Sequence, residues 1–147
     1  MRDYQSECIK VIQDTFVNHD RQLIQLPTGA GKTWIFSNYL SNNSDSALVL
    51  CPTRELQDQI INALNHFGIT SVSKKLSTNR KNYVLTYASL TEASLAIINR
   101  KGFDHIIIDE AHHSHCGNIV RLLQNITFSP KILGLTATPE RLDQKDL

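Results

Sequence analysis

Five short apolar runs, spaced along the whole chain, constrain its fold more than any other feature. They are QLIQL (22–26), ALVLCP (47–52), YVLTY (83–87), HIIID (105–109) and KILGLT (131–136). Nearly continuous apolar strands are typical of a parallel sheet with both faces covered, because each crossover returns the chain in the same direction. The pattern therefore predicts a three-layer α/β fold with a mainly parallel central sheet.

The segments between these runs carry helical periodicity. A first helical face, expected from residue 3 to about residue 19, consists of Tyr4, Cys8, Val11, Ile12, Thr15 and Phe16. A second consists of Leu56, Ile60, Leu64 and Phe67, which recur at the three-and-four spacing of a helix. We expect further helices after residue 33, at about 90–99 and at 117–125, and a short strand around 71–76.

Length and composition indicate one folded domain over residues 1–147. Single domains most often run to roughly 100–150 residues, and the hydrophobic and charged fractions of 41% and 20% are those of a globular protein. The formal net charge of +1 gives no global attraction to nucleic acid. Any nucleic-acid site must therefore come from local features.

The chain has no segment typical of membrane or secreted proteins. No stretch reaches the roughly 20 apolar residues of a membrane-spanning helix, and the N-terminus lacks the apolar core of a signal peptide. The three cysteines have no CxxC spacing, which suits reduced thiols better than a disulfide framework. These features predict a cytoplasmic protein with no membrane partner.

The sequence LPTGAGKT (26–33) lies between a predicted strand and a predicted helix, the context that a phosphate-binding loop requires. Small residues let successive amide N–H groups turn toward phosphate oxygens, and the helix points its positive end at the same anion. Lys32 can reach the β and γ phosphates, and the Thr33 hydroxyl is placed for Mg²⁺. The expected phosphate-binding residues are Thr28, Gly29, Ala30, Gly31, Lys32 and Thr33.

One departure leaves a simpler interpretation open. The general loop pattern wants glycine at position 26, where this chain has Leu26. An ordinary strand-to-helix turn would also use glycines and tolerate a lysine in the first helical turn. A lysine there opposes the helix dipole, however, so a bound anion explains it better.

The stretch HIIIDEAHHSHC (105–116) supplies the acids that phosphate chemistry needs. Asp109 and Glu110 follow a buried strand, at the end where α/β sheets place their ligand sites. Successive side chains leaving a strand point in different directions, so we expect Asp109 to face the metal and Glu110 the attacking water. Solvated acids at a strand end are the simpler alternative.

The same stretch leaves a zinc site open. Carboxylates, imidazoles and thiols are all metal ligands, so composition alone does not separate a magnesium-nucleotide site from zinc on His112, His113, His115 and Cys116. Four ligands from one short segment do not match the split spacing of structural zinc sites, which weighs against zinc.

Taken together, these motifs resemble the first RecA-like motor domain of a superfamily 2 helicase or translocase of the DEAH-box type. That superfamily's motif I does not keep the early glycine, so the departure at Leu26 counts in favour. The sequences DEAHHS and LGLTATPER look most like the branch of restriction-enzyme translocase subunits and related DNA helicases. The matching motifs are RDYQ (2–5), LPTGAGKT (26–33), PTREL (52–56), TYASL (86–90), DEAH (109–112) and TAT (136–138).

The resemblance implies a role for each motif residue. It makes Lys32, Asp109, Glu110 and His112 the catalytic set, with Mg²⁺ on Thr33 and Asp109. It implies that Arg2 and Gln5 recognise the adenine of ATP, that Thr53, Arg54 and Ser89 contact the nucleic-acid backbone, and that Thr136 and Thr138 couple hydrolysis to that contact. It favours DNA over RNA as the track.

The resemblance also implies a missing part. In this family the arginine finger comes from a second RecA-like domain, and nothing after ATPERLDQKDL supplies one. We therefore expect the chain to be the N-terminal half of a longer motor, and to bind ATP but hydrolyse it poorly by itself. A finger arginine can contribute 10³–10⁵ in rate.

Each outlying motif has a plainer reading. Thr53 has the position of a helix cap, and Ser89 with Glu92 has the S-x-x-E spacing of a capping box. Arg2 and Gln5 fit a polar helix start, and TAT fits a strand end. A P-loop kinase or GTPase, an RNA helicase domain, a zinc-dependent binding module and a non-catalytic nucleic-acid-binding domain remain as alternative functions.

Overall fold

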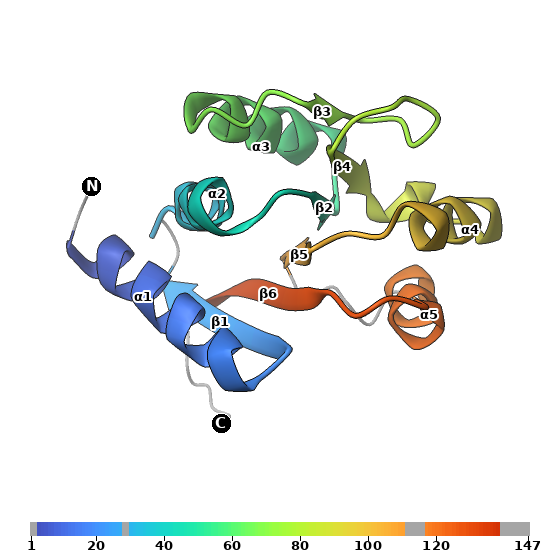
Figure 1. The fold of residues 1–147 in the computed structure, drawn as a ribbon. Coiled ribbons are helices and arrows are strands. Elements are labelled where there is room, and N and C mark those ends of the chain that lie inside the picture. Colours follow the sequence, from blue (N-terminus) through green and yellow to red (C-terminus); the bar gives the residue numbers. More distant parts are fainter. Residues whose placement is uncertain (1–2, 28–29, 111–116, 139–147) are drawn as a thin grey trace.

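The computed structural model describes residues 3–27, 30–110 and 117–138, which form an α/β domain around one sheet (Figure 1). The sheet has six strands in the order β1-β6-β5-β2-β4-β3, and every neighbouring pair is parallel. All five predicted apolar runs are strands. The strands are β1 Arg21–Pro27, β2 Ala47–Cys51, β3 Val72–Ser73, β4 Asn82–Thr86, β5 His105–Asp109 and β6 Lys131–Thr138.

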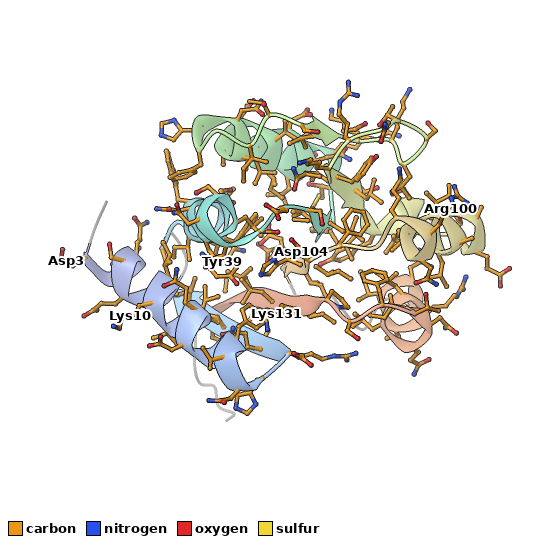
Figure 2. The ribbon with its side chains drawn as sticks, in the orientation of Figure 1. Asp3, Lys10, Tyr39, Arg100, Asp104 and Lys131 are labelled. Carbon is orange, nitrogen blue, oxygen red and sulfur yellow. The ribbon has the colours of Figure 1, made fainter. Side chains whose placement is uncertain are left out.

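Helices cover both faces of the sheet, as predicted. Figure 1 shows α1, α2 and α3 on one face and α4 and α5 on the other. Their outer faces carry charged side chains such as Lys10 and Arg100, which point away from the sheet (Figure 2). The helices are α1 Asp3–Asn18, α2 Lys32–Asn43, α3 Arg54–His66, α4 Glu92–Lys101 and α5 Gly117–Asn125, with a 3₁₀ turn, η1, at Tyr87–Ser89.

The core is divided by the sheet into two hydrophobic clusters. Strand β5 is buried along its whole length and contributes to both, because its side chains alternate between the faces. Ile107 packs in the cluster under α1, α2 and α3, while Ile106 and Ile108 pack in the cluster under α4 and α5. A strand that is apolar on both faces is what the run HIIID predicted.

Two details differ from the sequence prediction. Val11 is 54% exposed, so it lies outside the buried face of α1, which consists of Gln5, Ile12 and Phe16. The predicted strand around 71–76 is reduced to Val72–Ser73. No helix among residues 3–27, 30–110 and 117–138 is long and apolar enough to cross a membrane.

Candidate functional site

The carboxyl ends of β1, β6 and β5 bring distant motifs to one edge of the sheet. Strand β6 lies between β1 and β5, and the register pairs Pro27 with Thr138 and Asp109 with Leu135. The end of β1, the start of α2 and the end of β5 therefore meet at this edge. Open α/β sheets bind their ligands in this position.

The loop that follows β1 presents the N-terminus of α2 to this edge. Gly31 is the residue before α2 and has a left-handed conformation, with φ 82° and ψ 44°, which favours glycine. Among the described residues no side chain caps this helix, which favours an anion at its first amide N–H groups and positive end. Thr33 lies half-buried in the first turn.

Lys32 lies between the two predicted acids. Its Nζ is 3.4 Å from Oδ1 of Asp109 and forms an ion pair with Oε2 of Glu110. The three side chains are 15%, 1% and 23% exposed, so the cluster is largely shielded from solvent. Burial raises the pKa of Asp109, the charge of Lys32 opposes that rise, and the charge of Glu110 adds to it. A second positive charge at this site would favour both ionised carboxylates.

Helix α1 is tied to the loop by two side chains. Nε2 of Gln5 donates to the carbonyl oxygen of Ala30 at 3.0 Å, and the hydroxyl of Tyr4 donates to the same oxygen. Gln5 is only 7% exposed, which is unusual for a glutamine and is explained by this bond. The structure thus brings Gln5 to the phosphate loop, while its predicted contact with adenine stays a prediction.

The residues predicted to contact nucleic acid lie along the same edge. Strands β2 and β4 are neighbours, and their last residues, Cys51 and Thr86, are paired. Thr53 caps α3, where its Oγ1 accepts a hydrogen bond from the amide of Leu56 at 3.2 Å. Ser89 ends η1 and is exposed. Arg54 is exposed at the start of α3, whereas Thr136 is 5% exposed within β6.

The capping-box reading of Ser89 is wrong. The N-cap of α4 is Thr91, whose side chain accepts a hydrogen bond from the amide of Ser94 at 3.1 Å. Ser89 lies in η1 instead, where its Oγ donates to the carbonyl oxygen of Thr86 at 2.8 Å. Helix capping therefore accounts for the hydroxyl group of Thr53 but not for that of Ser89.

Tyr87 belongs to the site, although the sequence did not single it out. Its hydroxyl donates to the carbonyl oxygen of Asp109 and lies 3.1 Å from that of Glu110. Glu110 has φ 58°, the one positive φ at a non-glycine residue in the described part of the chain. The only sequence signal was the place of Tyr87 in TYASL, directly after a strand.

Several predicted residues lie outside the described part of the chain. They are Arg2, Thr28, Gly29, His112, His113, His115 and Cys116, together with the side chain of Thr138. The zinc hypothesis thus stays untested at its own residues. Elsewhere, in the three described ranges, no group of three or more His, Cys, Asp or Glu side chains is arranged to hold a metal ion.

Comparison with known proteins gives a family match over nearly the whole chain. The family described as "Type III restriction enzyme, res subunit" matches residues 1–141. The DNA 3'-5' translocase XPB2 of Sulfurisphaera tokodaii is 33% identical over 150 residues, covering 99% of this chain and 32% of the relative. The ATP-dependent DNA helicase MPH1 of Scheffersomyces stipitis is 34% identical over 162 residues, covering 95% of this chain and 15% of the relative. The chain spans no more than about a third of either relative.

Solved structures agree on the fold. The helicase domain of Pyrococcus furiosus Hef superposes with a TM-score of 0.71 at 25% identity, covering 95% of this chain and 34% of that one. The Sulfolobus solfataricus SWI2/SNF2 ATPase core, solved in complex with dsDNA, superposes with a TM-score of 0.73 over 94% of this chain and 32% of that one. Its identity of 21% supports a shared fold alone.

Proposed function

Because this chain belongs to the family of the type III restriction enzyme res subunit, we propose that it is the first motor domain of an ATP-dependent DNA helicase or translocase. The predicted RecA-like fold and the predicted relation to superfamily 2 helicases are confirmed at the family level. The DEAH-box subtype stays a prediction. The observation that carries the proposal is Lys32 of α2 lying between Asp109 and Glu110 beside an uncapped helix N-terminus.

In the proposed function, the loop before α2 and the side chain of Lys32 bind the phosphates of ATP. The exposed amides at the start of α2 favour an anion, and the Lys32 ammonium lies within reach of the same edge. Arrival of a triphosphate would draw Lys32 from the carboxylates toward the phosphate oxygens. Its partner Glu110 would then lose its counter-ion and present a carboxylate to water. In this scheme Lys32 holds Glu110 until nucleotide arrives.

The donor set also fits Mg²⁺. Magnesium prefers hard oxygen ligands, and Asp109 with the Thr33 hydroxyl supplies a carboxylate and an alcohol. Asp109 is 1% exposed, and burial raises its pKa, so its ionised form requires positive charge nearby. Asp109 and Thr33 would hold Mg²⁺, which when bound would supply that positive charge beside the phosphates. His112 is proposed to relay the nucleotide state to Thr136 and Thr138.

The proposed track is DNA, since the relatives reported above are named as DNA translocases and DNA helicases. Thr53, Arg54 and Ser89 are the proposed backbone contacts, because a helix N-terminus and exposed hydroxyl groups are phosphate binders. A second RecA-like domain is the proposed partner that supplies the arginine finger. Recognition of adenine is proposed for Arg2 and Gln5.

Two substitutions and one control test the proposal. Lys32→Ala is expected to weaken ATP binding at least tenfold, because it removes the cation that lies beside Asp109 and Glu110 at the start of α2. Glu110→Gln is expected to keep ATP binding but to lower hydrolysis at least 100-fold, because it removes the base. Lys74→Ala removes an exposed lysine that pairs with Asp58 and is expected to change neither.

Binding is measured on the 147-residue chain by calorimetry, and DNA-stimulated hydrolysis on a protein that joins the chain to a second motor domain. ATP binding that survives Lys32→Ala unchanged would contradict the phosphate site. Unchanged hydrolysis in Glu110→Gln would point to the non-catalytic alternative. Stronger stimulation by RNA than by DNA would favour the RNA helicase alternative.

A further inference from the structure

Tyr87 connects two parts of the site that lie far apart in the sequence. It is the first residue of η1 and 6% exposed. Its hydroxyl carries one proton and faces two consecutive carbonyl oxygens, those of Asp109 and Glu110. Its own carbonyl oxygen accepts a hydrogen bond from Nδ2 of Asn118, in α5, at 3.0 Å. The residue is thus held by α5 and in turn holds the end of β5.

The backbone that Tyr87 holds is in a conformation that needs support. Glu110 has φ 58°, a value that residues with a side chain rarely adopt and that persists only when surrounding contacts enforce it. The amide of Glu110 also donates to Oδ1 of Asp109 at 3.0 Å. The Tyr87 hydroxyl thus contacts the backbone from which the Glu110 side chain projects, while Lys32 contacts its carboxylate.

The other end of the connection is Ser89, two residues further along η1. The turn is a closed unit, because the amide of Leu90 donates to the carbonyl oxygen of Tyr87 at 3.2 Å and Ser89 Oγ donates to that of Thr86 at 2.8 Å. Ser89 itself is exposed at the edge of the sheet. Ser89 and Tyr87 thus belong to the same hydrogen-bonded turn.

We infer that Tyr87 is a positioning residue that transmits nucleic-acid binding at η1 to the Glu110 carboxylate. When a phosphate backbone engages Ser89, η1 shifts, the Tyr87 hydroxyl shifts, and the peptide units of Asp109 and Glu110 follow. The inference rests on the proposed function, because it requires that Ser89 contacts nucleic acid. It names the physical link between the track and the hydrolytic site.

The test follows backbone amide resonances of the 147-residue chain by NMR while a single-stranded oligodeoxynucleotide is added. The variant is Tyr87→Phe, which removes only the hydroxyl. The matched control is Tyr83→Phe, since Tyr83 is also buried in the cluster under α4 and α5 and its hydroxyl donates to the carbonyl oxygen of Thr78, away from the site.

In the wild type and in Tyr83→Phe, the oligonucleotide is expected to shift the amides of both Ser89 and Glu110. In Tyr87→Phe the shift at Ser89 is expected to remain, while the shift at Glu110 falls at least threefold. By linkage, a non-hydrolysable ATP analogue should shift Ser89 in the wild type and less so in Tyr87→Phe.

A Glu110 response that persists in Tyr87→Phe, or that is missing in the wild type while Ser89 responds, would overturn the inference and leave the proposed function standing. No response at Ser89 in the wild type would contradict the nucleic-acid contact itself, and the inference with it. If Tyr87→Phe does not fold, Asn118→Ala replaces it. That variant frees the Tyr87 backbone from α5 and is expected to lower the Glu110 response at least twofold.

Discussion

His105 is a buried imidazole at the start of β5, on the edge of the sheet opposite the site. It is 3% exposed, its Nε2 is 2.7 Å from the hydroxyl of Tyr39, and its Nδ1 has no hydrogen-bond partner among the described residues. Tyr39 lies between α2 and the sheet (Figure 2), and the rings of Tyr39 and Phe16 both contact the imidazole edge-to-face. The environment therefore favours the neutral ring.

This burial predicts a loss of stability in acid. Burial lowers the pKa of His105 from 6.5 to about 4; Asp104 opposes the change, and Lys131 adds to it. The unfolded chain therefore binds a proton below pH 6.5 that the folded chain does not bind until about pH 4. The stabilisation is complete above pH 6.5 and is lost as the pH falls. By pH 4 the loss reaches about 3 kcal/mol.

The measurement is the free energy of unfolding in urea at pH 7.5 and pH 4, for the wild type and for His105→Gln. The variant is expected to lose about 3 kcal/mol less than the wild type between these values. His19→Gln, which changes an exposed histidine, serves as control and is expected to follow the wild type. Equal losses in the wild type and His105→Gln would show that His105 is protonated without cost.

At the scale of the elements, apolar runs were a sufficient signal for five strands but not for the sixth. Strand β3 has two residues, one of them a serine, and lies at the edge of the sheet. Such a strand buries too little apolar area to leave a pattern. The face of α1 was misplaced for a related reason: a polar residue, Gln5, occupies a buried position because it bonds to Ala30, whereas Val11 is exposed.

Site residues that carry a local sequence motif were predicted. Residues that reach the site only through tertiary contacts, such as Tyr87, were missed. Glycines before a lysine, and acids after an apolar strand, are local signals, so Gly31, Lys32 and Asp109 were predicted as site residues, and the structure brings Lys32 and Asp109 together. The positive φ of Glu110 and its hold by Tyr87 depend on η1 lying beside the end of β5. No residue spacing in the sequence indicates that η1 lies beside the end of β5.

The N-cap residues of α3 and α4 allow two roles of Thr53 to be separated: capping of α3 and the proposed contact with nucleic acid. Thr53 and Thr91 each cap a helix through one hydrogen bond to an amide three residues later. Alanine at either position is expected to lower the free energy of unfolding by about 1 kcal/mol, because one amide loses its partner. Only Thr53→Ala is expected to weaken oligonucleotide binding in addition.

Thr53→Ser keeps a hydroxyl group at the same place and should restore both properties. The two readings are separated by comparing unfolding in urea with oligonucleotide affinity for all three variants. Equal affinities in Thr53→Ala and Thr91→Ala would mean that Thr53 is a cap and nothing more. An unfolding free energy unchanged in both would contradict the capping geometry.

At the scale of the whole molecule, the last described strand, β6, lies in the interior of the sheet, next to its edge strand β1. Strand β6 lies between β1 and β5, and so it holds the element that leads to the phosphate loop beside the element that ends in the acids. The five apolar runs resemble one another, and this similarity is why the order of the strands was not predicted. The contact between Lys32 and Asp109 thus joins the two parts of the chain that β6 holds side by side.

This position predicts which leucines matter to stability. Leu133 of β6 is fully buried in the cluster under α1, α2 and α3, whereas Leu23 of the edge strand β1 is 64% exposed. Leu133→Ala removes the same atoms as Leu23→Ala but leaves a cavity between the sheet and the helices that cover it, so it is expected to cost about 2–5 kcal/mol of unfolding free energy. Leu23→Ala is expected to cost no more than about 0.5 kcal/mol.

The two variants are compared by unfolding in urea and by ATP affinity at a temperature where both are folded. Leu133→Ala is expected to weaken ATP binding as well, because a loosened β6 lets the end of β1 move relative to the end of β5. Similar costs for the two leucines would contradict the importance of β6 as an interior strand. Lower stability in Leu133→Ala with unchanged ATP affinity would mean that the loop and the acids hold their arrangement without support from the strand between them.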